Sequence, residues 1–264
     1  MSIRLALQDR FAPGDDVRAK FESARRYGFD AIELSVDPIV AARDALRDRV
    51  PVSAITGGYR GWLIDPDDGA RRAAREDLAT LVDLAGELGC GCVVVPIWGR
   101  TRNLPNIGTG RSREEDEALF VDAMRELARR AQRSGARLFI EPLNRYQNDV
   151  CNTIAEALRL RERIASDAVF VMGDVFHMNI EESDPAKAII SAGRWFGHLH
   201  LADNQRMEPG TGHLDLPPVF EALATIAYDG YASYELARTS GAPDAVLPLS
   251  VSRVRDLMRE ATLA

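Results

Sequence analysis

Four polar side chains, Glu141, Asp174, His200 and Glu235, lie at or near the ends of short apolar segments. Successive members are 33, 26 and 35 positions apart. Any one of them alone would more often be a capping or salt-bridged residue at the end of a strand. Together, two glutamates, an aspartate and an imidazole form a mixed oxygen and nitrogen donor set, which suits Mn²⁺, Mg²⁺ or Co²⁺ better than a thiolate-preferring ion. Because three of the four groups are anionic, we expect them to bind a divalent cation.

The local sequence indicates how the first of these groups is positioned. Residues 138–140 are apolar and predict a short buried strand, and Pro142 ends it because proline cannot donate to a strand ladder. Glu141 is therefore expected at the carboxyl end of that strand, facing a loop. The intervals are close to one strand-plus-helix unit of a (β/α)8 barrel, roughly 31 residues if about 250 residues form eight units. In such a barrel the four groups would meet at the carboxyl-terminal face, where barrel active sites lie.

The whole chain predicts this strand–helix alternation eight times, which favours an α/β protein with a single (β/α)8 TIM barrel. Residues 7–10 contain no glycine, and this weakens the alternative of an open dinucleotide-binding sheet. No linker or low-complexity run interrupts the sequence, so we expect one TIM-barrel domain over residues 1–264. The predicted strands are 3–7, 31–34, 52–55, 91–96, 138–141, 169–174, 196–201 and 232–236. The predicted helices are 15–27, 38–48, 67–88, 113–134, 153–164, 184–192, 216–227 and 246–263.

The composition excludes several classes of protein. A net charge of −7 argues against a nucleic-acid partner, which would require a basic face. No stretch approaches 18 uninterrupted apolar residues, and the first residues lack the apolar run of a signal peptide, so we expect no membrane span and a cytoplasmic location. The chain has three cysteines, Cys90, Cys92 and Cys151, and disulfides are not expected in a chain of this size. Cys90 and Cys92, which lie beside a predicted strand, are expected to be buried structural thiols. The two lysines, Lys20 and Lys187, fall in predicted outer helices, away from the strand ends where a Schiff base would form.

Three motifs resemble those of a known superfamily. Residues 139–146 (FIEPLNRY), 173–179 (GDVFHMN) and 198–206 (HLHLADNQR), the last followed by PGTG, are similar to the motifs at strands five, six and seven of the xylose-isomerase-like sugar isomerases and epimerases. This group includes D-tagatose and D-psicose 3-epimerases, hydroxypyruvate isomerase and inosose-processing enzymes. The resemblance extends over essentially the whole chain. It implies that Glu141, Asp174, His200 and Glu235 are the metal ligands, with Mn²⁺ preferred and Co²⁺ or Mg²⁺ as alternatives.

The resemblance also implies catalytic roles. The two ligand glutamates, Glu141 and Glu235, would act as the acid/base pair on the two faces of the reacting carbon, and His177 and Arg206 would contact the substrate. The metal would bind a carbonyl and an adjacent hydroxyl oxygen and stabilise the enediolate that forms when the neighbouring proton is removed. One carboxylate removes this proton and the other returns it. The expected activity is a sugar isomerase or epimerase acting on a small, unphosphorylated ketose or hydroxy-carbonyl compound.

The sequence departs from the 3-epimerase pattern at two positions. Six residues after the first ligand the 3-epimerases carry a further glutamate, whereas this chain carries Gln147, which hydrogen-bonds a sugar hydroxyl but provides no base. His213 follows the PGTG turn, where an acidic residue is expected. Glu33, near the end of the second predicted strand, is a further candidate for binding a substrate hydroxyl, and His198 for supporting a metal ligand.

Aromatic residues occupy loops at the expected mouth of the barrel. Trp98 is a candidate substrate contact, and Tyr59 and Trp62 lie in another loop on the same face. The loop of residues 97–112 is long for a compact domain, and such loops are usually functional.

Three alternative functions follow from the same residues. The runner-up is a metal-dependent lyase, a dehydratase or β-eliminase, on a keto-sugar or related cyclic polyol, since removal of the same proton leads to elimination when a leaving group is present. Metal-dependent phosphodiester cleavage requires more histidines than the four in this chain. A passive binder has no evident use for paired glutamate ligands. The resemblance further implies a homodimer or homotetramer.

Overall fold

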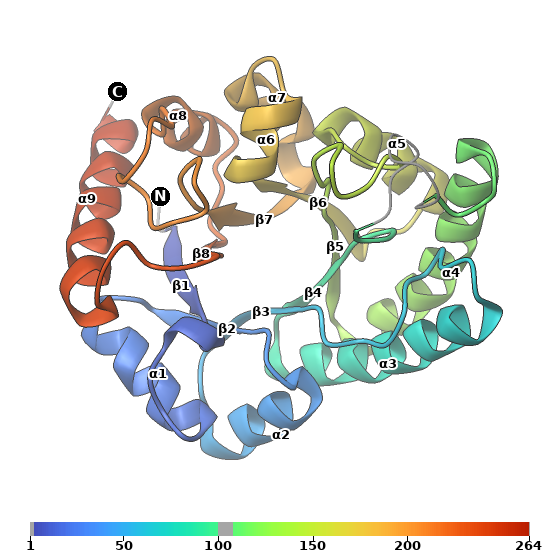
Figure 1. The fold of residues 1–264 in the computed structure, drawn as a ribbon, viewed down its shortest axis with the longest axis horizontal. Helices are drawn as coiled ribbons and strands as arrows, with labels where there is room; N and C mark the ends of the chain where they lie inside the picture. Colours follow the sequence, from blue (N-terminus) through green and yellow to red (C-terminus); the bar gives the residue numbers. More distant parts are fainter. Residues whose placement is uncertain (1–2, 100–107, 264) are drawn as a thin grey trace.

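The computed structural model describes residues 3–99 and 108–263. Eight parallel strands pair in chain order, and the last pairs with the first, so the sheet closes into a barrel. Figure 1 looks along this barrel, with the helices arranged in a ring around the strands. The predicted (β/α)8 TIM barrel is therefore confirmed. The strands are β1 Arg4–Gln8, β2 Ala31–Leu34, β3 Val52–Thr56, β4 Gly91–Val94, β5 Arg137–Ile140, β6 Val169–Asp174, β7 Phe196–Leu201 and β8 Tyr231–Tyr234.

The helices begin and end at residues with clear local causes. Ser112 and Thr153 each form a capping box with a glutamate three residues later, which starts α4 and α5. Gly89 and Gly135 adopt left-handed conformations (φ 70° and 79°) that end α3 and α4. The helices are α1 Val17–Arg26, α2 Pro38–Asp48, α3 Asp68–Leu88, α4 Arg113–Ser134, α5 Ile154–Ile164, α6 Val175–Glu181, α7 Pro185–Ala192, α8 Pro217–Thr225 and α9 Pro243–Leu263, with 3-10 turns η1 Asp9–Phe11 and η2 Gly193–Trp195.

One helix was not predicted from the sequence. The chain turns directly from β6 into α6, because Asp174 ends the strand and its carboxylate accepts a hydrogen bond from the backbone N–H of Phe176 at 2.9 Å. The helix predicted at 184–192 is α7, which follows α6 before the chain enters β7. Asp174 therefore serves as a helix cap as well as a strand-end residue.

The barrel interior contains a compact apolar layer formed by Ala54, Val93, Phe139 and Met172. Phe139 fits because its neighbours lack side chains: a Cβ on Gly197 would lie 2.7 Å from the Phe139 ring. A larger core lies between the strands and the surrounding helices. With its interior packed, the barrel has room for a ligand only at its ends.

The structure bears on the expectations for the cysteines, for membrane spans and for the long loop. The three cysteines are buried and free, which confirms the predicted burial of Cys90 and Cys92. In the described ranges, no helix is both long enough and apolar enough to cross a membrane. Of the long loop at 97–112, residues 100–107, which include Pro105, lie outside the described residues.

Candidate active site

The four candidate ligands meet at the carboxyl ends of β5 to β8. Glu141 directly follows β5 and Glu235 directly follows β8, and their backbone N–H groups donate to the carbonyls of Val94 and Leu201, each at 3.1 Å. Asp174 ends β6 and lies opposite His200 of β7 in the strand register. One oxygen or nitrogen from each of the four side chains lies within 4.8 Å of all the others. The interval pattern of the sequence thus brings all four groups to one point.

The imidazole of His200 faces this cluster through its Nδ1 atom. That nitrogen lies 2.9 Å from Glu235 Oε2, 3.3 Å from Glu141 Oε1 and 3.9 Å from Asp174 Oδ2. However, among the described residues neither His200 Nδ1 nor Glu141 Oε1 has a partner with hydrogen-bond geometry, although both atoms are buried. Buried polar atoms without partners are costly. Their convergence with two further carboxylates fits a divalent metal ion, which takes oxygen and imidazole ligands.

The two glutamates have different electrostatic environments. Burial raises the pKa of Glu141 to about 7, although the nearby His200 opposes this effect. Burial alone would also raise the pKa of Glu235, but the Arg206 guanidinium and the His200 imidazole hold it well below its ordinary value. For His200, burial disfavours the charged ring, yet Glu33 and Glu235 raise its pKa well above the ordinary value. These shifts favour the protonated forms of Glu141 and His200, and a metal ion that binds to the cluster would displace those protons.

A second group of buried residues supports His200 from the opposite side. Glu33 is fully buried, and its carboxylate lies 3.1 Å from His200 Nε2 as an ion pair and 2.8 Å from His198 Nε2 as a hydrogen bond. Gln8 and Thr56 also donate to Glu33, at 3.0 and 2.8 Å. Burial alone would raise the pKa of Glu33, but the two histidines hold it well below its ordinary value. The Glu33 carboxylate therefore faces the Nε2 side of the His200 ring as an ion-pair partner, while Nδ1 faces the ligand cluster.

Arg206 closes the cluster on a third side. It donates to both carboxylate oxygens of Asp174, at 2.7 and 2.5 Å, and also to Glu235. Its backbone has a positive φ of 60°, which is unusual for a residue with a side chain, and is held there by hydrogen bonds to Asp203 and from Ala237. The loop after β7 therefore fixes this guanidinium beside two of the carboxylates.

His177 of α6 is held by the loop after β5. Its Nδ1 lies 3.2 Å from the backbone nitrogen and 2.8 Å from the side-chain nitrogen of Asn144. Since the backbone N–H can only donate, Nδ1 is the acceptor and the ring proton belongs on Nε2. Burial lowers the pKa of this imidazole, which favours the neutral ring. His177 therefore offers an Nε2–H donor near Asp174, 3.6 Å away.

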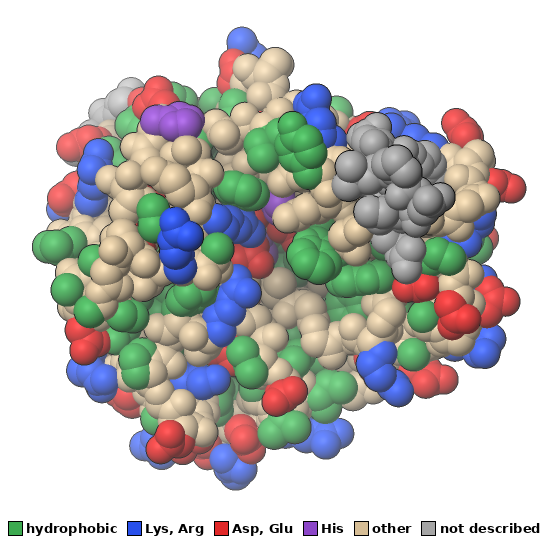
Figure 2. Space-filling model, viewed as in Figure 1, with side chains coloured by type: hydrophobic (Ala, Val, Ile, Leu, Met, Phe, Trp, Pro, Cys, Tyr) green, Lys and Arg blue, Asp and Glu red, His purple; other side chains and the backbone are tan. Residues whose placement is uncertain are grey.

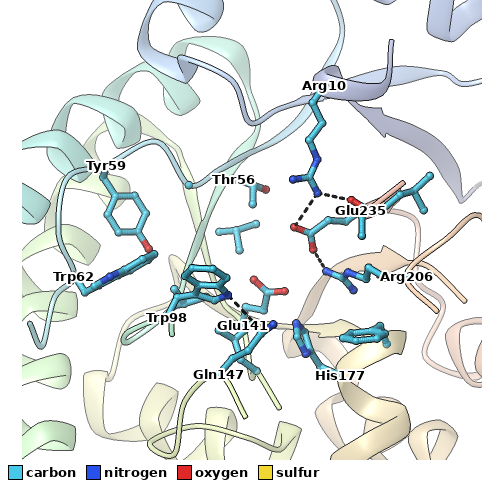
Figure 3. A pocket seen from close by; sticks show the side chains of 17 residues that line it. Arg10, Thr56, Tyr59, Trp62, Trp98, Glu141, Gln147, His177, Arg206 and Glu235 are labelled. Atoms are coloured by element: carbon cyan, nitrogen blue, oxygen red, sulfur yellow. Dashed lines mark hydrogen bonds and ion pairs between the residues drawn. The ribbon is translucent and has the colours of Figure 1, made fainter. Parts of the chain in front are cut away.

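A cavity of about 530 Å³ opens above the cluster, at the mouth of the barrel. Figure 2 shows the mouth as a hollow at the centre of this face, with acidic and histidine side chains at its depth and basic and hydrophobic side chains around its rim. Figure 3 shows Glu141 and Glu235 entering the same space from different strands. The predicted site residues that line it are Glu141, Glu235, His177, Arg206, Gln147 and Trp98.

The predicted substrate contact Glu33 lies elsewhere, as does His213, the histidine after the PGTG turn. Glu33 was predicted to contact substrate, but it is not among the described residues that line the cavity, because its carboxylate lies beneath His200. His213 is exposed on its loop and also does not line the cavity. His198, predicted as support for a ligand, contacts Glu33 rather than His200 through a hydrogen bond.

Arg10, which comes from the turn after β1, is a cavity residue that was not predicted from the sequence. Its guanidinium donates to the carbonyl of Leu236 at 2.6 Å and lies 4.0 Å from Glu235 Oε1, on the cavity wall. The signal was present, because Arg10 lies three residues after the first predicted strand, on the face of the barrel where Glu141 ends the fifth. The candidate ligands were found from their regular spacing along the chain, whereas a single arginine has no such spacing to indicate a role.

The fold and the ligand cluster place this chain in a known class of proteins. It belongs to the xylose isomerase-like TIM barrel family, whose sequence model matches residues 21–257.

Two relatives and one solved structure show which members of this family the chain resembles. The chain is 34% identical over 240 residues to the 3-dehydro-D-guloside 4-epimerase of Escherichia coli strain K12, covering 88% of this chain and 92% of that protein. It is 38% identical over 237 residues to a D-psicose 3-epimerase of Enterocloster bolteae, covering 83% and 76%. The crystal structure of the Escherichia coli 3-keto-D-glucoside 4-epimerase superposes with a TM-score of 0.89 at 32% identity, covering 97% of this chain and all of that one. These relatives are epimerases, which supports the isomerase class for this chain.

Proposed function

We propose that the protein is a divalent-metal-dependent sugar epimerase. The observation that carries this proposal is the pair Glu141 and Glu235, whose carboxylates face one cavity from different strands while belonging to one ligand cluster. Epimerisation next to a carbonyl needs one group to remove a proton and a second to return it to the opposite face. Two carboxylates with opposite pKa shifts are suited to these two roles.

The metal ligands would be Glu141, Asp174, His200 and Glu235, and we propose Mn²⁺ as the ion, with Co²⁺ or Mg²⁺ as alternatives. When bound, such an ion would polarise the substrate carbonyl and stabilise negative charge on its oxygen. In the proposed reaction one glutamate accepts the proton from the carbon next to the carbonyl. The other donates a proton to the opposite face of that carbon, which inverts it. Arg206 and the His177 Nε2–H would hold the substrate oxygens in place.

The names of the relatives support a shared substrate chemistry. A 3-epimerase of psicose inverts the carbon beside the C2 carbonyl, and a 4-epimerase of a 3-dehydro sugar inverts the carbon beside the C3 carbonyl. Both substrates therefore present a carbonyl next to the inverted centre. We propose the same arrangement for the substrate of this protein, a polyhydroxy ketone.

The test is to incubate the protein with ketoses and keto-glycosides after loading with Mn²⁺, and to separate the products by chromatography. We expect an epimer of the substrate, and loss of activity after chelation with recovery on adding Mn²⁺. An unsaturated product would instead indicate the lyase reaction, the alternative that stays open because Gln147 departs from the 3-epimerase pattern. Formation of a homodimer or homotetramer stays a prediction, which sedimentation measurements would test.

A further inference from the structure

The loop after β7 folds around one buried carboxylate, that of Asp203. Its Oδ1 atom accepts hydrogen bonds from the backbone N–H groups of Asn204 and Leu214, at 2.9 and 3.2 Å, and Oδ2 accepts from Gly210 at 2.9 Å. Burial alone would raise the pKa of Asp203, but the N–H group of Gly212 and the three just named hold it below its ordinary value. The ionised carboxylate therefore ties the two ends of this loop together.

The backbone of Asp203 closes a tight turn at the start of the same loop. Its N–H donates to the carbonyl of Met207 at 2.8 Å, and its carbonyl accepts from the N–H of Arg206 at 2.8 Å. Arg206 adopts a left-handed conformation in this turn, with a φ of 60°. Such a conformation costs free energy in a residue with a side chain, and it persists only where the surrounding structure imposes it. Asp203 forms a large part of that surrounding structure.

The position of the Arg206 guanidinium depends on this turn. The guanidinium donates to Asp174 and Glu235, two of the four candidate ligands, and its Cζ atom lies 4.8 Å from the centre of the Phe176 ring. Figure 3 shows it beside Glu235 at the cavity. Displacing a positioned group by about 1 Å can slow a reaction roughly 10²-fold. Holding the backbone of Arg206 therefore also holds the two carboxylates that its side chain contacts.

The PGTG sequence at residues 209–212 fits closely around the Asp203 carboxylate. Its two glycines supply two of the N–H groups that face this carboxylate. Gly212 also leaves no room for a side chain, because a Cβ there would overlap the side-chain oxygens of Asn204, Asp203 and Gln205. This gives a role to a sequence motif that the ligand cluster alone does not explain.

We propose that Asp203 is a positioning residue for the active site. Its carboxylate closes the loop after β7 and so holds the Arg206 guanidinium on Asp174 and Glu235. Asp203 does not itself line the cavity, so its effect on the reaction passes through Arg206. This inference rests on the proposed function where its test measures epimerase activity.

The first test is a double-mutant cycle of Asp203→Asn and Arg206→Gln, with kcat/KM measured for D-psicose and Mn²⁺-loaded protein. In Asp203→Asn the amide turns an NH2 group toward backbone N–H donors, and two donors cannot pair. We expect kcat/KM to fall about 10²-fold as Arg206 shifts. Arg206→Gln should lower kcat/KM at least as much. The double variant should lie within about twofold of Arg206→Gln, because positioning then has no guanidinium to act on.

A second readout does not depend on activity. In ¹⁵N-labelled protein, the side-chain N–H signal of Arg206 is identified by its loss in Arg206→Gln. We expect this signal to exchange slowly with solvent in the unaltered protein, because the guanidinium is largely buried and bonded to two carboxylates. In Asp203→Asn the exchange should be about tenfold faster or more, since the loop opens more often.

Two further variants separate positioning from general damage. Gly212→Ala forces the loop open while keeping the Asp203 carboxylate, so it should couple to Arg206→Gln in the same way, and it replaces Asp203→Asn if that variant does not fold. Asp30→Asn is the matched control, because its carboxylate accepts the Leu5 N–H at 2.8 Å at the amino-terminal end of the barrel, away from the site. It should leave kcat/KM and the Arg206 signal unchanged.

The outcomes distinguish this inference from the proposed function. Full activity in Asp203→Asn, or losses that multiply in the double variant, would overturn the inference while leaving an epimerase. Absence of any epimer from ketoses and keto-glycosides would contradict the proposed function. In that case the exchange measurement decides alone, and an unchanged Arg206 signal in Asp203→Asn would overturn the inference.

Discussion

Glu141 and Glu235 are the same residue type at equivalent strand ends, yet their surroundings differ. Arg206 lies beside Glu235 and holds its pKa well below the ordinary value against the effect of burial, whereas burial raises the pKa of Glu141 to about 7. Figure 3 shows the guanidinium on the Glu235 side of the cavity. The side chain beside each carboxylate therefore decides whether its pKa lies above or below the ordinary value.

The first prediction concerns these two carboxylates. Glu141→Gln and Glu235→Gln each keep a ligand oxygen but lose the basic group, so we expect kcat to fall about 10²- to 10⁴-fold. Metal content, measured by elemental analysis, separates loss of acid/base catalysis from loss of metal. Glu114→Gln, on the exposed first turn of α4, is the matched control. Full activity in either site variant, with metal bound, would remove that residue from the acid/base pair.

The second prediction concerns protons in the ligand cluster. Near pH 7 the metal-free protein holds a proton on His200, whose pKa is well above its ordinary value, and a partial proton on Glu141, whose pKa is about 7. Metal ions bind the deprotonated ligands, so binding should release between about one and two protons. Because the metal-free state binds more protons, metal affinity should weaken as pH falls through 7. Calorimetry in buffers of different ionisation enthalpy measures the release, and a pH-independent affinity would refute this picture.

At the scale of elements, the strands set the depth of each group. His198 and His200 are two residues apart in β7, so both point into the barrel, one layer apart. Glu33 of β2 contacts both, which joins opposite parts of the barrel through buried polar groups. This arrangement predicts that Glu33 of β2 orients the candidate ligand His200 of β7.

The third prediction tests that support. Glu33→Gln keeps the size of the side chain but removes the charge facing His200, so we expect metal affinity to fall about 10- to 100-fold. Glu208→Gln provides the control, since Glu208 is also buried but contacts Ser240 outside the ligand cluster. If both variants bind Mn²⁺ equally well in a titration, Glu33 has only a structural role.

The strands could be predicted from the sequence where an apolar run ends at a proline or an acidic residue. Pro142 limits β5, and the interval from Glu141 to Asp174 indicated the repeating unit. The sequence did not predict α6, because its seven residues are too few to establish a helical period. It also did not predict the depth of Glu33, since position near a strand end does not tell whether a side chain reaches the cavity or lies beneath it.

For the whole molecule, closure of the barrel explains why residues from distant parts of the chain meet. Arg10 from the turn after β1 and Glu235 after β8 lie beside one another only because β1 pairs with β8. Strand–helix alternation predicted that closure, and the intervals together with the family resemblance indicated the candidate ligands. The contacts of Arg10 and the bond between Trp98 and Gln147 depend on loop conformations, which no periodic pattern encodes.

Proton removal next to a carbonyl is the central step of the proposed reaction. The decisive measurement is proton NMR of the Mn²⁺-loaded protein with ketoses and keto-glycosides in deuterated water. We predict deuterium at the carbon next to the carbonyl, together with the epimer, and little or no epimer in Glu141→Gln or Glu235→Gln, because inversion needs both carboxylates. An epimer formed without deuterium, or an unsaturated product in its place, would contradict the proposed pair of glutamates acting as acid and base.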